Sequence, residues 1–218
     1  MGKCLDGISR RFENHACREV PVKIKSVKKI TDYFHLNMFE ITYSDTNDRK
    51  KIWSFASRND PPKCVSGHFE TPDAVVIVPY HSENQKLVII KEFRVPLGDY
   101  QYGFPAGLVD NGETAETSVK RELKEETGLT VTRINKVSPP IYSSSGMTDE
   151  SISMVYVECT GEASKEGNTS SEDIETIFVS PDEARSLCSN DQIKCDVKTW
   201  LVLSMYGETG KICGSRKK

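Results

Sequence analysis

Long apolar runs, a signal-peptide core and a strong excess of either charge are all missing from this chain of 218 residues. No apolar stretch approaches the ~20 residues of a membrane-spanning helix, and the amino terminus has no apolar core of the kind that directs secretion. A net charge of −3 offers no broad basic surface for nucleic acid. We therefore expect a cytoplasmic protein that binds neither membranes nor nucleic acid.

Cysteine pairs with metal-binding or disulfide spacing are also missing. The seven cysteines are odd in number, scattered and never spaced as Cys-x-x-Cys, which disfavours both a zinc site and a disulfide framework. We expect them to be reduced thiols. Hydrophobic residues make up 37% and charged residues 28% of the chain, which is long enough for one globular domain with a small appendage.

The apolar pattern predicts a small sheet near the amino terminus. Residues 22–57 alternate between polar and β-branched or aromatic residues, which is typical of strands, and a turn cluster at 44–48 divides the later part. Three strands are expected, and the segment Asn59-Asp60-Pro61-Pro62 predicts a boundary after them. We therefore assign residues 1–62 to an antiparallel sheet region.

The rest of the chain mixes strands with helices. Residues 73–80 form a near-continuous apolar run, as expected of a strand covered on both faces. Further strands are expected at 86–93, 100–104, 131–142, 151–158 and 175–180, with helices at 114–127, from Ser180-Pro181 onward, and at 196–206. The predicted fold class is α+β, with a main domain at 63–210 and a frayed tail at 211–218.

Residues 107–129, GLVDNGETAETSVKRELKEETGL, carry the strongest functional signal. The predicted helix 114–127 contains neither proline nor glycine, and Gly128 follows where a helix end favours a positive φ. Ala115, Val119 and Leu123 recur every four residues and form one apolar stripe. Glu122, Glu125 and Glu126, here called the carboxylate cluster, lie three and four residues apart on another face.

The carboxylate cluster favours a bound cation. Like charges at these spacings cost roughly 0.2–0.5 kcal/mol per pair, and anions near a helix C-terminus also oppose its dipole. Carboxylate oxygens suit Mg²⁺ or Mn²⁺, which also bind phosphate oxygens. The alternative is a solvated surface helix in which Lys120, Arg121 and Lys124 balance the glutamates.

This segment is similar to the signature of the Nudix hydrolases, which cleave nucleoside diphosphates linked to another moiety. Every fixed position is filled: Gly107, Glu113, Arg121-Glu122-Leu123, Glu125-Glu126 and Gly128-Leu129. The resemblance implies an α/β/α sandwich with a mixed sheet. It also implies Mg²⁺, or Mn²⁺, held by the carboxylate cluster and the carbonyl of Ala106.

The same resemblance gives structural roles to four residues of the segment. Glu113 and Arg121 are expected to pair and to brace the turn before the helix. Gly107 is expected to let the Ala106 carbonyl point inward, and Gly128 to close the helix.

A second resemblance, to ADP-ribose pyrophosphatases, covers KEFRVPLGDYQYGFPAGLVDNGE and the upstream IWSFASRN. It implies that Trp53 stacks on an adenine, that Arg58 helps to bind it, and that Arg94 contacts phosphate or ribose. We also expect the amino-terminal sheet to form a homodimer, with residues shared across subunits. The alternatives are core filling for Trp53 and solvated surface charges for the two arginines.

The resemblance implies that Glu125 and Glu126 are catalytic as well as metal-binding. It also implies a general base, which in the family is a carboxylate on a loop outside the helix. The long polar stretch TGEASKEGNTSSEDIETIF, residues 160–178, supplies the candidates, and likeness to the pyrophosphatase pattern favours Glu172. Glu166, Asp173 and Glu175 remain alternatives.

One departure from the subgroup affects the substrate. Ser145 stands where ADP-ribose pyrophosphatases usually carry a proline, about sixteen residues past the signature. ADP-ribose, cleaved to AMP and ribose 5-phosphate, remains the leading substrate. Another nucleotide sugar, a dinucleoside polyphosphate or coenzyme A are alternatives, as is a non-catalytic ADP-ribose-sensing module, although such modules typically lose signature glutamates.

Overall fold

The computed structural model describes residues 22–168 and 173–212, which fall into two compact units. Among the described residues, the first unit holds 22–66 together with a short later segment, Gly146–Asp149. The second unit holds residues 67–145 and, of the later chain that the structure describes, 150–168 and 173–212. The chain therefore leaves the second unit once and returns to it.

The first unit is built on a three-stranded antiparallel sheet, which confirms the predicted amino-terminal sheet. Its strands, in the order β1-β2-β3, are β1 Lys23–Lys29, β2 Asn37–Ser44 and β3 Lys50–Ser57. Phe39 of β2 and Phe55 of β3 lie opposite one another, with ring centroids 5.8 Å apart, and both are buried. A short helix, α2 Lys63–Ser66, ends the unit.

Segment Gly146–Asp149 runs along the free edge of β3. The backbone amide of Ala56 donates to the carbonyl of Met147 at 2.8 Å, and Ala56 forms a parallel bridge with Thr148. The amide of Lys63 donates to the Asp149 carboxylate at 2.8 Å. A segment far along the chain thereby pairs with the edge strand, whose backbone groups would otherwise be unpaired.

The second unit contains a mixed eight-stranded sheet. Its strands are β4 Ala74–His81, β5 Lys86–Arg94, β6 Asp99–Gly103, β7 Ala106–Leu108, β8 Thr130–Val137, β9 Ile141–Tyr142, β10 Ser151–Thr160 and β11 Ile174–Val179. The main order is β11-β5-β4-β10-β8, while β6 pairs with β5, β7 with β4 and β9 with β10. Strands β4 and β10 run parallel, and the other pairs in the described residues are antiparallel.

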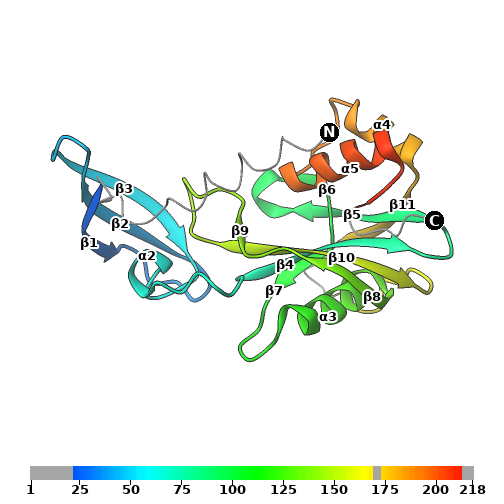
Figure 1. The fold of residues 1–218 in the computed structure, drawn as a ribbon, viewed down its shortest axis with the longest axis horizontal. Coiled ribbons are helices and arrows are strands. Elements are labelled where there is room, and N and C mark those ends of the chain that lie inside the picture. Colours follow the sequence, from blue (N-terminus) through cyan, green and yellow to red (C-terminus); the bar gives the residue numbers. More distant parts are fainter. Residues whose placement is uncertain (1–21, 169–172, 213–218) are drawn as a thin grey trace, which may run out of the picture. The chain divides into compact units, whose positions relative to one another are not determined.

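Helices cover both faces of this sheet (Figure 1). On one face lies α3 Ala115–Thr127, and on the other lie α4 Pro181–Cys188 and α5 Val197–Thr209. The central strand β4 supplies both cores, since alternate side chains of a strand point to opposite faces. Val75 and Ile77 pack with Leu123 of α3, whereas Val76 and Val78 pack with Leu203 of α5. The predicted α/β/α sandwich is confirmed.

Two local predictions differ from the structure. The stretch expected as one strand at 131–142 is divided into β8 and β9, because Pro139 and Pro140 between them cannot donate backbone hydrogen bonds. The three-residue strand β7 was not predicted, because three residues are too few to show the alternation of polar and apolar residues that indicates a strand. Across the described residues, none of the helices has the length and apolar content that crossing a membrane requires.

Candidate active site

The signature segment forms a strand, a turn and a helix. Strand β7 pairs with β4, so that Gly107 lies opposite Val75 in the sheet. Helix α3 begins after Thr114, whose side chain accepts a hydrogen bond from the amide of Thr117 at 3.2 Å. It ends at Gly128, which has the left-handed φ of 75° that favours glycine there.

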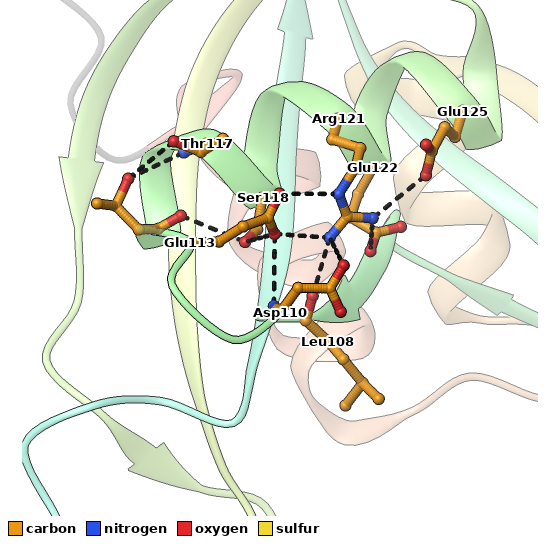
Figure 2. A network of polar contacts seen from close by, with 9 residues as sticks. Leu108, Asp110, Glu113, Thr117, Ser118, Arg121, Glu122 and Glu125 are labelled. Atoms are coloured by element: carbon orange, nitrogen blue, oxygen red, sulfur yellow. Dashed lines mark hydrogen bonds and ion pairs between the residues drawn. The ribbon is translucent and has the colours of Figure 1, made fainter.

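Arg121 is the centre of a polar network that ties the turn to the helix (Figure 2). Its guanidinium donates to both carboxylate oxygens of Glu113, from Nε at 3.1 Å and from Nη2 at 2.9 Å. The same Nη2 donates to the carbonyl of Leu108 at 3.1 Å. This two-point pairing has the geometry in which arginine binds a carboxylate most strongly.

The same guanidinium also contacts two members of the carboxylate cluster. Nη1 of Arg121 donates to Glu122 at 2.7 Å and to Glu125 at 3.2 Å. Arg121 therefore offsets part of the repulsion within the cluster. The hydrogen bonds to Glu113, the largest cause, and to Glu122 raise the pKa of Arg121 above its already high ordinary value.

Glu113 has an unusually acidic side chain because of this network. The hydrogen bond from Arg121 is the main cause, followed by one from the hydroxyl of Ser118 at 2.7 Å, and together they lower the pKa of Glu113 to about 2. Ser118 itself is fully buried. The sequence analysis did not single out Ser118, although its position one turn after Thr114 places it on the side of the helix that faces Glu113.

Gly107 leaves the space that the Glu122 side chain occupies. A Cβ atom added at Gly107 would lie 1.9 Å from the Glu122 carboxyl carbon and from one of its oxygens. The φ of Gly107 is not in the left-handed region. This position therefore requires glycine because glycine has no side chain, and not because of its backbone conformation.

Glu126 is held against the strand that precedes the turn. Its carboxylate accepts a hydrogen bond from the amide of Ala106 at 3.1 Å, and the residue is 8% exposed. Glu126 and Ala106, both predicted site residues, are thus brought into contact. Glu113, Arg121, Glu122 and Glu125 join them around the same turn.

The donor set suits a hard divalent cation. Carboxylate oxygens are the ligands such ions prefer, and the glycine at 107 lets the Glu122 carboxylate lie directly against β7. In the described part of the chain no three His, Cys, Asp or Glu side chains are already gathered as a metal cluster. Arg121 holds two of the carboxylates instead, as a guanidinium that balances their charge.

The predicted substrate residues lie in both units. Trp53 of β3 is 50% exposed, and its indole Nε1 donates to the carbonyl of Gly146 at 3.1 Å. Arg58 is exposed just after β3. Arg94 ends β5 in the second unit and donates to Glu92 at 3.0 Å.

The structure describes three of the four candidates for the loop general base. Glu172 lies outside the described residues. Asp173 accepts a hydrogen bond from the hydroxyl of Tyr100, and Glu175 is an exposed residue of β11 opposite Lys91. Glu166 is exposed in a turn whose next residue, Gly167, lies against the backbone of Glu125.

Comparison with known proteins gives relatives with named activities. The chain is 31% identical over 138 residues to an ADP-ribose pyrophosphatase of Saccharomyces cerevisiae, covering 63% of this chain and 58% of that protein. It is 28% identical over 124 residues to an ADP-sugar pyrophosphatase of Mus musculus, covering 56% and 54%. The chain thus spans little more than half the length of these relatives.

A solved structure shares the fold. The crystal structure of an ADP compounds hydrolase superimposes with a TM-score of 0.63 at 18% identity, covering 88% of this chain and 97% of that one. The family model of the NUDIX domain matches residues 70–197, which include the whole of β7, the turn and α3. As this match extends over more than half of the 218 residues, the chain belongs to the Nudix family.

Proposed function

We propose that the protein hydrolyses the diphosphate linkage of ADP-ribose or a related nucleotide sugar, in a magnesium-dependent reaction that gives AMP and a sugar phosphate. The observation that carries the proposal is the carboxylate cluster of α3, in which Arg121 holds Glu122 and Glu125 and the Glu122 carboxylate packs against Gly107. The names of the relatives from yeast and mouse support the substrate class.

The carboxylate cluster and the Ala106 carbonyl would hold the cation. The chemistry that Mg²⁺ or Mn²⁺ supplies when bound is neutralisation of phosphate charge and activation of water. Arg121 and Glu113 tie the turn to helix α3, which bears the three carboxylates. Such supporting contacts commonly matter nearly as much as the ligands themselves.

A loop carboxylate would take the proton of the attacking water. Glu172 is the proposed base, with Glu166, Asp173 and Glu175 as alternatives. A positioned general base typically contributes 10²–10⁴-fold to the rate. Single Glu→Gln and Asp→Asn variants of these residues should therefore differ in activity. Only the variant at the general base should lose activity by about that factor.

Trp53, Arg58 and Arg94 are the proposed substrate contacts. The half-exposed ring of Trp53 suits stacking on an adenine, and its hydrogen bond to Gly146 fixes the orientation of the indole. The two guanidinium groups suit phosphate or ribose oxygens. This set favours an adenine-bearing nucleotide sugar over the other substrates of the class.

We also propose a cytoplasmic homodimer. The first unit leaves Ile24, Ile52 and Trp53 each at least half exposed, and exposed apolar side chains on a small sheet suit a protein partner. The described cysteines Cys64, Cys159, Cys188 and Cys195 are free thiols, as expected in a reducing compartment.

The test is a substrate panel with a metal-site variant. Purified protein with Mg²⁺ is given ADP-ribose, other nucleotide sugars, dinucleoside polyphosphates and coenzyme A, and the released phosphomonoester is measured. We expect ADP-ribose to be the best substrate. We expect Glu126→Gln to lower kcat/KM by about a thousandfold, equivalent to about 4 kcal/mol of transition-state stabilisation.

The control is Glu116→Gln, the same change at an exposed position in the first turn of the same helix. It should leave kcat/KM unchanged. If ADP-ribose is untouched while another nucleotide sugar is cleaved, the substrate proposal fails and the reaction class stands. Full activity of Glu126→Gln would remove that residue from the site, and binding without any turnover would favour a sensing module.

A further inference from the structure

The turn that follows β10 is packed on the last turn of α3. The amide of Ser164 donates to the carbonyl of Thr127 at 2.9 Å, which satisfies one of the carbonyls left open at the end of the helix. The amide of Asn168 donates to the carbonyl of Lys165 at 3.1 Å and closes the turn. Residues 164–168 are here called the capping turn.

Two glycines make this packing possible. A Cβ atom added at Gly167 would lie 2.6 Å from the carbonyl oxygen of Glu125 and 2.8 Å from its Cα. These are backbone atoms of a helix, which cannot rotate away as the end of a flexible side chain can. On the other side, a Cβ atom at Gly128 would lie 2.6 Å from the amide nitrogen of Ser164.

The two glycines are required for different reasons. Gly128 has a left-handed φ of 75°, so it is constrained by its own backbone as the end of the helix. Gly167 has no such φ, and its backbone conformation is open to any residue. The space against Glu125 is therefore what Gly167 supplies.

Glu125 is consequently held from two directions. Arg121 donates to its carboxylate at 3.2 Å, and the capping turn lies against its backbone. The next residue, Glu126, is buried and accepts the hydrogen bond from Ala106. A shift of the backbone at Glu125 would move both carboxylates, because they are adjacent in the same helical turn.

We propose that Gly167 is a positioning residue for the carboxylate cluster. By admitting the capping turn to the backbone of Glu125, it sets the position of the last turn of α3 and so of the oxygens that receive a divalent cation. This role rests on the proposed function of the cluster as a metal site. Gly167 touches neither the substrate nor the reacting atoms and acts through Glu125.

The test compares Gly167→Ala with Gly103→Ala. A Cβ atom at Gly103 would meet its nearest neighbour at 3.8 Å, an ordinary contact, and Gly103 also has no left-handed φ. Mn²⁺ affinity is measured without substrate from the electron paramagnetic resonance signal of free Mn²⁺, and kcat and KM are measured for ADP-ribose. We expect Gly167→Ala to weaken Mn²⁺ binding and lower kcat by about 10–100-fold, and Gly103→Ala to change neither.

A double-mutant cycle separates positioning from general stability. If Gly167 acts by placing Glu125 and Glu126, adding Gly167→Ala to the double variant Glu125→Gln/Glu126→Gln should cause little further loss of Mn²⁺ affinity. Full additivity of the two losses would overturn the proposal, as would wild-type Mn²⁺ affinity in Gly167→Ala. Should Gly167→Ala not fold, Ser164→Pro, which removes the amide that donates to Thr127, takes its place with the same expectations.

The outcomes distinguish this proposal from the proposed function. If the wild type binds Mn²⁺ but hydrolyses nothing in the substrate panel, the assigned reaction fails and the Mn²⁺ comparison still decides the role of Gly167. If ADP-ribose is hydrolysed while Gly167→Ala matches the wild type, the reaction stands and the positioning role is wrong.

Discussion

Gly107 shows at the scale of one residue how the absence of a side chain shapes the site. From the signature we expected this glycine to let the Ala106 carbonyl turn inward. In the structure the Glu122 carboxylate occupies the place where a Cβ atom would lie. The amide of Ala106, rather than its carbonyl, makes the hydrogen bond that links β7 to the cluster.

Gly107→Ala is therefore expected to displace Glu122 and to lower kcat/KM by about 10–100-fold, because a methyl group cannot share space with the carboxylate. Measurement of kcat/KM for ADP-ribose at saturating Mg²⁺ checks this. The far-ultraviolet circular dichroism spectrum should stay that of the wild type, since the backbone conformation at Gly107 is accessible to alanine. An alanine variant with wild-type kcat/KM would mean that Glu122 can be placed elsewhere without loss.

At the scale of the element, α3 depends on the turn that precedes it. The Arg121–Glu113 pair and the Ser118 hydroxyl join the turn to the helix, and Thr114 caps the first helical residues. The helical period predicted that the carboxylate cluster shares one side of α3. It could not predict that one guanidinium, that of Arg121, would reach Glu113 and the cluster together, since that depends on where the turn lies.

The acidic Glu113 predicts a dependence of stability on pH. Its folded pKa of about 2 lies below the ordinary value of 4.5, so the paired carboxylate stabilises the fold fully above about pH 4.5. That contribution is lost as the pH falls from 4.5 towards 2. Glu113→Gln should lower the midpoint of urea unfolding at pH 6, and its difference from the wild type should shrink at pH 4 and again at pH 3.

Glu116→Gln serves as the comparison for this titration, because Glu116 is exposed in the same helix. Its unfolding midpoint should follow that of the wild type at all three values of pH. A midpoint difference for Glu113→Gln that stays constant from pH 6 to pH 3 would contradict the assignment of this pairing to the folded state.

At the scale of the whole molecule, the chain forms two compact units joined by more than one crossing. The proline pair at 61–62 suggested a boundary near the end of the first sheet, and the short helix α2 follows it within the first unit. Nothing in the sequence pattern marked Gly146–Asp149 as a partner of β3. Pairing of a distant segment with a strand edge leaves no local periodic signal.

The proposed homodimer gives a prediction at this scale. Light scattering coupled to size-exclusion chromatography should report twice the 24.5 kDa mass of one chain. Replacing the exposed apolar residues Ile24 and Ile52 of the first sheet with lysine should shift the mass towards one chain, because charged side chains resist burial in an interface. A single-chain mass for the wild type at micromolar concentration would rule the dimer out.

The sequence by itself determined the family, the fold class and the residues of the signature segment, because these depend on spacing along the chain. A helical period places three glutamates on one side, and an apolar run places β4 between two helical layers. The assigned roles of individual residues stay predictions.

Only the tertiary structure decided which backbones lie in contact. Gly107 admits Glu122, Gly167 admits the backbone of Glu125, and Gly146–Asp149 extends the edge of β3. Each contact joins residues that are distant along the chain. Their spacing in the sequence carries no information about such contacts, because close approach is set by how the strands, helices and turns pack.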